Sequence, residues 1–279
     1  MKFFLLLAAA LLPAAGAAFD LQGHRGARGL APENTLPAFA AALSIGVSTL
    51  ELDVGVTKDG VAVIAHDRGL NPDLTRDAEG RWLGLPGPTF RSLTYAELQR
   101  YDVGRLNPGT GYGKRYPQQR PADGARIPRL SDLFALVRKA GNSAVRFNIE
   151  TKLSPLAPQE TADPETFAQT LVDLVRAEGM TSRVMIQSFD WRTLQAVQRL
   201  APQIPTVYLS AQQKFLDNIL AAEPAGSPWV AGFQLKDHGS VPRMVKAAGG
   251  AVWSPYFGDL DAAKLAEAHA LGLKVVPWT

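Results

Sequence analysis

The sequence contains no cysteine, so the chain relies neither on disulfides nor on a lipid attached to cysteine. It also lacks a strong charge imbalance, because 29 Lys and Arg residues stand against 26 Asp and Glu residues. Basic and acidic residues are interspersed, and there is no run of Lys and Arg and no RNA-binding or helix-turn-helix signature. We therefore expect no nucleic-acid partner.

Long apolar runs are absent except at the N-terminus. Lys2 precedes an apolar run over residues 3–12, and small residues follow as far as Ala18. This order is typical of a cleavable secretory signal, and the run is too short to span a bilayer comfortably. We expect residues 1–18 to be a signal peptide and the mature chain to be periplasmic or secreted, without stable membrane insertion. An uncleaved anchor is the alternative.

Residues 19–279 are enough for one large α/β domain. Apolar patterns of strand and helix length alternate along them, most regularly after residue 130. The predicted strands are 48–54, 145–151, 184–188, 206–209, 230–235, 251–254 and 274–278. The predicted helices in this part of the chain are 130–140, 164–178, 191–200, 212–222, 242–248 and 262–271. Repeated β-then-α units favour a TIM (β/α)8-type barrel, with a doubly wound sheet as the alternative.

The first β-α-β unit is followed by a hairpin signal. A short strand at 20–23 leads into a loop, and Thr35 is placed to cap a helix that Gly46 ends. Strand 48–54 follows, and the Asp59-Gly60 pair after it predicts a two-residue type I′ turn. That register sets Asp53 opposite His66, with Cβ atoms roughly 5 Å apart.

Residues 68–128 are rich in glycine and proline and predict a long irregular loop. One short helix near residues 94–100 is expected inside it. A loop of this length within a compact domain is usually functional, so we expect a lid or substrate cover. A disordered insertion is the alternative.

Two predicted strands carry polar residues at every second position. Both faces of a barrel strand are dry, so such strands usually read as continuous apolar runs. If the apolar residues face the helices, Glu51 and Asp53 point inward from one strand. Asn148, Glu150 and Lys152 point inward from another. Both sets lie towards the carboxyl ends of their strands, where barrel enzymes build their sites.

Three carboxylates in one barrel mouth predict a metal ion. At roughly 5 Å and an effective dielectric near 20, each like-charged pair costs on the order of 3 kcal/mol. Lys152 cannot offset three such pairs alone, whereas a divalent cation can. Oxygen ligands favour a hard ion, Ca²⁺ or Mg²⁺, over zinc. An ion network with Arg25, Arg146 and Lys152 is the alternative.

Two histidines complete the predicted site. His24 ends the first strand, and His66 follows the hairpin. Two imidazoles beside a carboxylate cluster suit a general acid and a general base that exchange a proton near neutral pH. Arg25 and Lys152 would then bind an anion together with the metal ion, in the arrangement that stabilises phosphoryl charge.

Five motifs now indicate a family. In chain order they are HRGARGLAPENTLPAF, ELDVGVTKDGVAVIAHD, FNIETK, QSFD and the terminal VVPWT. Together they resemble the glycerophosphodiester phosphodiesterase family over almost the whole mature chain. The resemblance implies a TIM barrel, a divalent metal ion that is usually calcium or magnesium, and a small-molecule phosphodiester substrate. The implied reaction hydrolyses deacylated phospholipids to glycerol 3-phosphate and an alcohol.

The resemblance also implies a role for each matching residue. Glu51, Asp53 and Glu150 would be the metal ligands, and His24 and His66 the acid and base. The residues implied to contact substrate are Arg25 and Lys152 at the phosphate and Trp278 as a wall of the glycerol pocket.

The C-terminal end departs from the family pattern. Family members normally continue past the Trp-Thr pair with a further helix and a closing strand, whereas this sequence stops at Thr279. By that comparison residues 230–235 are an extra segment, and the barrel is truncated before its closing C-terminal strand. An unclosed barrel leaves strand edges open. The seven polar site residues all lie upstream.

The predicted function is metal-dependent hydrolysis of glycerophosphodiesters. One alternative is phospholipase D-like hydrolysis of lysophospholipids on the same fold, which needs an apolar docking surface that residues 68–128 do not show. Another is a non-catalytic exported protein that binds phosphate esters. The sequence leaves open the head group, the metal ion, the nucleophile and the oligomeric state.

Overall fold

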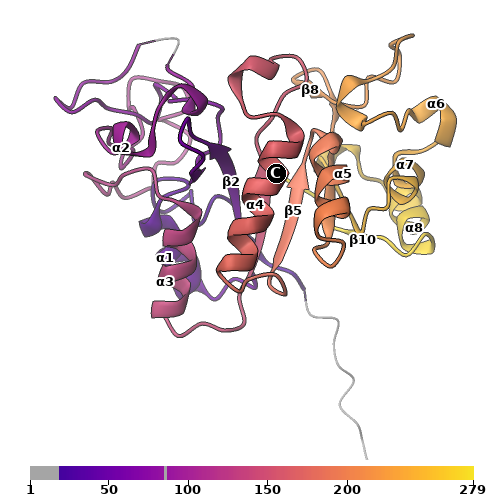
Figure 1. The fold of residues 1–279 in the computed structure, drawn as a ribbon, viewed down its shortest axis with the longest axis horizontal. Coiled ribbons are helices and arrows are strands. Elements are labelled where there is room, and N and C mark those ends of the chain that lie inside the picture. The colour runs from indigo at the N-terminus through magenta and orange to yellow at the C-terminus, as the bar shows by residue number, and fades with distance from the viewer. Residues whose placement is uncertain (1–18, 85–86) are drawn as a thin grey trace, which may run out of the picture.

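The computed structural model describes residues 19–84 and 87–279 (Figure 1). The predicted signal peptide, residues 1–18, lies outside the described residues. Among these residues, none of the helices is long and apolar enough to cross a membrane. Strands and helices alternate for most of the chain, in the order β1 (Gln22–Gly23), α1 (Leu36–Ile45), β2 (Thr49–Val56), β3 (Ala62–Ile64), α2 (Tyr95–Leu98), α3 (Leu130–Lys139), β4 (Arg146–Thr151), α4 (Pro164–Ala177), β5 (Val184–Ser188), α5 (Trp191–Leu200), β6 (Thr206–Ser210), β7 (Gln212–Gln213), β8 (Leu216–Asp217), α6 (Leu235–His238), α7 (Val241–Ala247), β9 (Val252–Pro255), α8 (Ala262–Ala270) and β10 (Lys274–Val275).

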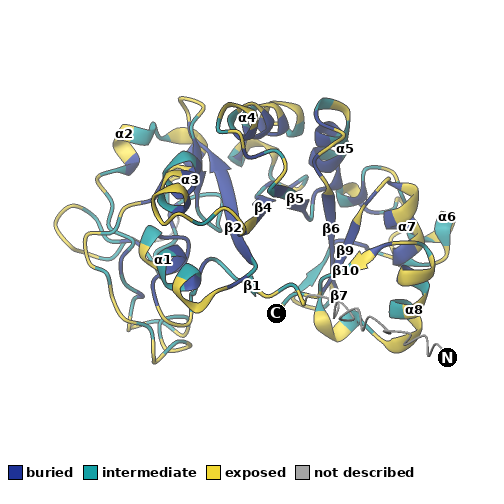
Figure 2. Cartoon of the chain, turned by 90° about the horizontal axis from the view of Figure 1, so that it is seen from below, coloured by how far each residue is buried: buried dark blue, intermediate teal, exposed yellow. Residues whose placement is uncertain are grey.

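The main sheet is parallel and curled. Its strands follow the order β1-β2-β4-β5-β6-β9-β10, and each neighbouring pair on that path is parallel. Figure 2 shows these strands as an arc with the helices on its outer side. This is the predicted TIM-type arrangement, since a doubly wound sheet would carry helices on both faces. Within the described residues, no hydrogen-bonded ladder joins β1 to β10.

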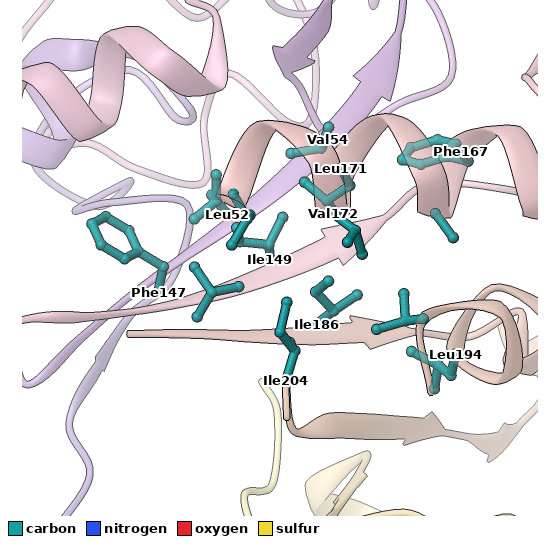
Figure 3. Packing of buried hydrophobic residues seen from close by; sticks show 14 of the residues in the cluster. Leu52, Val54, Phe147, Ile149, Phe167, Leu171, Val172, Ile186, Leu194 and Ile204 are labelled. Carbon is teal, nitrogen blue, oxygen red and sulfur yellow. The ribbon is translucent and has the colours of Figure 1, made fainter. Parts of the chain in front are cut away.

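The outer face of the sheet forms the hydrophobic core. Leu52 and Val54 of β2 and Ile149 of β4 are fully buried, and Figure 3 shows them beside Leu171 and Val172 of α4. Each such side chain contributes about 1.5–3 kcal/mol through burial. Because side chains alternate along a strand, the residues between them point to the inside of the arc. The predicted inward orientation of the acidic residues is therefore confirmed.

Helix α1 begins and ends where the sequence predicted. The Thr35 hydroxyl accepts a hydrogen bond from the Ala38 amide at 3.3 Å, which satisfies one of the free N–H groups of the first turn. At the other end Gly46 adopts a φ of 86°, a conformation that glycine tolerates. These caps fix the start of α1 and hence the end of the loop that joins β1 to α1.

The hairpin between β2 and β3 differs from the prediction. The Thr57 amide donates to the Val61 carbonyl at 3.0 Å, so the loop holds three residues and not two. Gly60 has a φ of 78°, but Asp59 does not adopt the positive φ that a type I′ turn also requires. The Thr57 hydroxyl donates to Asp59 at 2.6 Å, and this local bond favours the longer turn.

The longer turn shifts the pairing by one residue. Asp53 lies opposite Ala65, whose amide donates to the Asp53 carbonyl at 2.9 Å. The predicted pairing of Asp53 with His66 is therefore wrong. His66 instead follows the end of β3, where its ring still reaches the cavity described below.

The described residues between 68 and 128 form a long loop with a small hydrophobic core. Leu70, Phe90, Leu98 and Ile127 of this loop are buried together with Val63 of β3. The expected short helix is α2, which a reciprocal capping pair begins. The described part of this insertion is thus ordered against the barrel, which argues against a disordered insertion.

Two predicted elements between β6 and β9 are wrong. Residues 212–222 form the short β7–β8 hairpin and turns in place of a helix. The side chain of Asn218 accepts from the Ala211 amide at 2.9 Å, and Asp217 accepts from two following amides, so these bonds replace helical ones. Residues 230–235 are not a strand, because Ala231 and Gly232 adopt φ values of 53° and 91°.

Candidate active site

The structure brings the three predicted metal ligands together. Asp53 of β2 is the ladder neighbour of Glu150 on β4, and Glu51 lies two residues earlier on the same face of β2. One side-chain oxygen from each residue lies within 4.8 Å of the other two. All three residues are buried, with relative exposures of 8% for Glu51, 1% for Asp53 and 7% for Glu150. The inside of the sheet thus carries a compact cluster of oxygen donors.

Hydrogen bonds from three directions orient these carboxylates. The Gln187 side chain on β5 donates to Glu51 Oε1 at 2.8 Å, and the Arg25 backbone amide donates to Glu51 Oε2 at 2.8 Å. The Asn34 side chain donates to Asp53 Oδ2 at 2.9 Å. Each oxygen can accept more than one bond, so these donors leave room for a further ligand.

Two partly buried cations, Lys152 and Arg25, lie against the cluster. Lys152 Nζ is 2.7 Å from Glu150 Oε1 and 3.5 Å from Asp53 Oδ1. Arg25 Nε is 3.4 Å from Asp53 Oδ2, and its Nη1 donates to Glu33 Oε1 at 2.7 Å. Burial alone would lower the pKa of Lys152, but the Glu150 and Asp53 carboxylates raise it above its usual value. Both cations therefore keep their charge.

The carboxylate pKa values reveal crowded negative charge. Burial, together with the charge of Asp53, raises the pKa of Glu51 well above its usual value. Burial also raises the pKa of Glu150, although Lys152 opposes it. Burial would raise the pKa of Asp53 too, but nearby cations, Lys152 foremost, hold it below its usual value. For two of the three acids the charged form is therefore disfavoured, and a bound cation would favour it.

The donor set fits a hard divalent cation. Within the described residues, the three acids above and Glu33 form ion pairs with only two Lys or Arg side chains, Arg25 and Lys152, so these four buried carboxylates outnumber their paired cations by two. The donors are oxygens, which calcium and magnesium prefer. A network of these acids and cations alone would leave that surplus in place. Glu51, Asp53 and Glu150 could therefore hold a divalent metal ion.

The two predicted histidines, His24 and His66, line one cavity at the site. His24 Nε2 is 3.9 Å from Glu51 Oε2. Burial and the nearby arginines, Arg28 foremost, lower the pKa of His24 to about 3, so its ring is neutral at neutral pH. His66 Nδ1 is 3.2 Å from Asp67 Oδ1, which orients the second ring.

Aromatic residues, among them Phe189 and Trp278, also line this cavity, which has a volume of about 1340 Å³. Trp278 follows β10, and its ring packs edge-on against Phe189 at 5.4 Å and against Tyr256 at 5.2 Å between centroids. Phe189 and Tyr256 follow β5 and β9, so all three rings lie beyond the carboxyl ends of parallel strands. Trp278 thus lies at the predicted face of the barrel.

Several residues of the site were not predicted. Gln187 has the same inward parity on its strand as the acids have on theirs, so the same pattern could have found it. Glu33 and Asn34 were interpreted only as part of a loop before a helix. Asp67 and Tyr112 lie in loops, and no local pattern in the sequence indicates their place in the site.

A comparison with known families agrees with this geometry. Residues 24–279 match the model of the glycerophosphoryl diester phosphodiesterase family. The chain belongs to this family.

Curated relatives in the family share part of their length with this chain. A glycerophosphodiester phosphodiesterase of Caldanaerobacter subterraneus subsp. tengcongensis is 30% identical over 182 residues, which are 65% of this chain and 62% of the relative. A glycerophosphodiester phosphodiesterase of Bacillus subtilis strain 168 is 29% identical over 188 residues, which are 67% of this chain and 57% of the relative. The chain thus spans less than two thirds of either relative.

A solved structure of the family covers more of the chain. It is the crystal structure of a candidate glycerophosphoryl diester phosphodiesterase from Silicibacter pomeroyi DSS-3, with 39% identity and a TM-score of 0.81. The match covers 92% of this chain and 82% of that one. The family's fold therefore extends over nearly all of the described residues.

Proposed function

We propose that this chain hydrolyses glycerophosphodiesters to sn-glycerol 3-phosphate and an alcohol, with Ca²⁺ or Mg²⁺ as its metal ion. The observation that carries the proposal is the buried cluster of Glu51, Asp53 and Glu150 beside His24 and His66. Family membership supports it. An Oleispira antarctica phosphodiesterase of similar fold, with 22% identity and a TM-score of 0.63, is a complex with the product sn-glycerol-3-phosphate.

The reaction breaks the bond from phosphorus to the leaving alcohol oxygen and forms one to a nucleophile, either water or a neighbouring hydroxyl of the substrate. A bound divalent ion would polarise a phosphoryl oxygen. Arg25 and Lys152 bind phosphate oxygens and offset the charge that develops on them. One of His24 and His66 removes the proton of the nucleophile, and the other protonates the leaving oxygen. Trp278 lines the glycerol side of the pocket.

The direct test is release of glycerol 3-phosphate from glycerophosphocholine with Ca²⁺, with Mg²⁺ and with EDTA. We expect turnover with one or both ions and none with the chelator. A chain that binds the diester but releases no glycerol 3-phosphate under any of these conditions is a non-catalytic binding protein.

Histidine variants test the acid and base. His24→Ala and His66→Ala should each lower kcat by about 10²–10⁴-fold, the usual contribution of a positioned acid or base. His238→Ala is the matched control, because His238 lies in α6 against Phe233 and away from the cavity. Normal turnover in both site variants would show that the assignment is wrong.

Lysophospholipids are a second candidate substrate class. The exposed side chains of Leu156, Phe215 and Phe257 follow β4, β6 and β9, so they lie beyond the carboxyl ends of strands as the site does. They offer exposed apolar side chains, and none of the large apolar side chains that are described between residues 68 and 128 is exposed. Parallel assays of glycerophosphocholine and lysophosphatidylcholine separate the two, since the proposed activity requires a higher kcat/KM for the former.

We also propose that the protein is exported and acts in the periplasm or after secretion. The charged, apolar and small-residue order of residues 1–18 supports this. N-terminal sequencing of the extracytoplasmic protein should find a start near residue 18 or 19, whereas an intact Met1 on a protein retained in the cytoplasm would refute export.

A further inference from the structure

Residues 112–120 of the long 68–128 loop contact residues 25–34, the loop that begins with Arg25 next to His24. The Gln119 side chain donates to the Arg28 carbonyl at 2.7 Å, and the Arg120 amide donates to the Leu30 carbonyl at 2.9 Å. The Arg28 guanidinium also lies 5.3 Å from the centroid of the Tyr116 ring. Residues 112–120 are thus joined to residues 25–34 by both backbone and side-chain contacts.

Tyr112 makes the contact that reaches furthest into the site. Its hydroxyl donates to Glu33 Oε2, while the other oxygen of Glu33 accepts from Arg25 Nη1 at 2.7 Å. Arg25 in turn places Nε 3.4 Å from Asp53 Oδ2. Glu33 is 6% exposed, so water competes little for its oxygens. The chain of contacts from the insertion to the acidic cluster is therefore short and largely buried.

The loop that Tyr112 contacts is strained at both ends. Arg25 has a φ of 52° and Asn34 a φ of 56°, values in the left-handed region that residues other than glycine seldom adopt. The Asn34 amide donates to the Arg25 carbonyl at 3.0 Å and ties these two positions together. Such a conformation persists only when surrounding contacts hold it. The bonds of Glu33 are among those contacts.

We propose that Tyr112 is a positioning residue: its hydroxyl fixes Glu33, and Glu33 holds the Arg25 guanidinium in the orientation that binds phosphate. The inference rests on the proposed function, since it concerns the phosphate contact of Arg25. The guanidinium has five N–H donors; Nη1 donates to Glu33, whereas Nε lies 3.4 Å from Asp53 Oδ2 without forming a hydrogen bond. The Glu33 bond therefore sets which donors face the cavity.

The test compares two tyrosines that differ in one contact. Tyr112→Phe removes the hydroxyl on Glu33 and keeps the ring, whereas Tyr116→Phe removes the hydroxyl of the ring that packs against it at 5.8 Å. Calorimetry with sn-glycerol 3-phosphate in the presence of Ca²⁺ or Mg²⁺ measures binding without turnover. We expect Tyr112→Phe to raise Kd, and KM for glycerophosphocholine, by about three- to tenfold, well within the range that misplacement can cause. Tyr116→Phe should change both by less than twofold.

A double-mutant cycle separates positioning from general stability. If Tyr112 acts through Arg25, Tyr112→Phe should have less than a twofold effect on Kd in an Arg25→Lys background. Thermal unfolding of Tyr112→Phe and Tyr116→Phe should give similar Tm values. Equal effects of Tyr112→Phe in both backgrounds, or no effect on Kd in the native background, would overturn the proposal.

The measurements distinguish failure of the proposed enzymatic function from failure of the positioning role of Tyr112. Turnover by the native chain with an unchanged Tyr112→Phe variant overturns only the role of Tyr112. Product binding that Tyr112→Phe weakens, in a chain without turnover, supports the positioning role and refutes the enzymatic function. Absence of both binding and turnover in the native chain refutes both.

Discussion

The two substitutions Asp53→Asn and Glu51→Gln should differ in their effect on stability, although both replace an acid of the same cluster by its amide. Cations hold the pKa of Asp53 below its usual value, so its charge stabilises the fold. Burial and the charge of Asp53 raise the pKa of Glu51, so its charge opposes folding. The pair of variants therefore tests whether the effect of removing an acid depends on the charged groups around that acid.

The distances give the magnitude for Asp53. Lys152 Nζ and Arg25 Nε lie 3.5 and 3.4 Å from its oxygens, and at an effective dielectric of about 20 each attraction is worth about 5 kcal/mol. The oxygens of Glu51 and Glu150, at up to 4.8 Å, each repel it by about 3.5 kcal/mol or more. The Coulomb balance is at most roughly 2–3 kcal/mol in favour of the charged form, and burial of Asp53 reduces it. Asp53→Asn should cost up to about that much, because it leaves Arg25 and Lys152 poorly paired.

Glu51 forms no ion pair with a Lys or Arg side chain of the described residues, so Glu51→Gln should behave differently. Glutamine at position 51 keeps one acceptor for either Gln187 or the Arg25 amide. The lost hydrogen bond is offset by relief of repulsion from Asp53 and Glu150. We therefore expect Glu51→Gln to lie within about 1 kcal/mol of the native chain when a chelator is present.

Urea denaturation at pH 7 with EDTA measures these differences. In a second series, Ca²⁺ or Mg²⁺ at a hundredfold excess over Kd should stabilise the native chain by about 2.7 kcal/mol, and neither variant should show that gain. The difference between Asp53→Asn and the native chain should shrink as the pH falls below about 3.9, because the unfolded chain then binds the proton that the folded carboxylate resists. Equal stability of Asp53→Asn and the native chain at pH 7, with the metal-induced gain retained, would refute the reasoning.

Two further substitutions test contacts around the cluster. Gln187→Leu removes the buried donor to Glu51 and should cost about 1–3 kcal/mol in urea denaturation; a loss below the error of measurement would contradict the role given to that bond. Gly26→Ala should cost about 2–4 kcal/mol, because Gly26 has a φ of +80° and an added Cβ would lie 2.7 Å from the Ala38 backbone carbon. Gly29→Ala is its control, since nothing lies within 4 Å of the added Cβ, and similar losses in the two variants would refute this explanation.

The parts of the fold that the sequence predicted are those set by short-range patterns. Strand β5 and helix α5 have the predicted bounds, because each apolar pattern is interrupted at once by polar or capping residues such as Asp190. The inward side of Glu51, Asp53 and Glu150 followed from the two-residue period of a strand buried on both faces. These features need only the local order of residues.

Tertiary hydrogen bonds overrode the local pattern elsewhere. The apolar spacing of residues 215, 216, 219 and 220 fits a helix, but Asn218 joins the Leu209 carbonyl and the Ala211 amide, which a helix there would not allow. In the hairpin, the Asp59-Gly60 pair correctly predicted a turn, but the hydrogen bond from the Thr57 hydroxyl to Asp59 favours a loop of three residues. In both segments a polar side chain supplied bonds that periodicity does not describe.

The number of acidic groups at the site could not be predicted from the sequence, because one of them is held by a residue far away in the chain. The sequence pattern placed three acids beside Arg25 and Lys152, which leaves one negative charge. The structure adds Glu33, bound to Arg25 and to Tyr112 from 79 residues away, and the surplus becomes two. The acidic groups that pair with Arg25 can therefore be listed in full only when the contact between residues 25–34 and a distant insertion is known, and no local pattern encodes that contact.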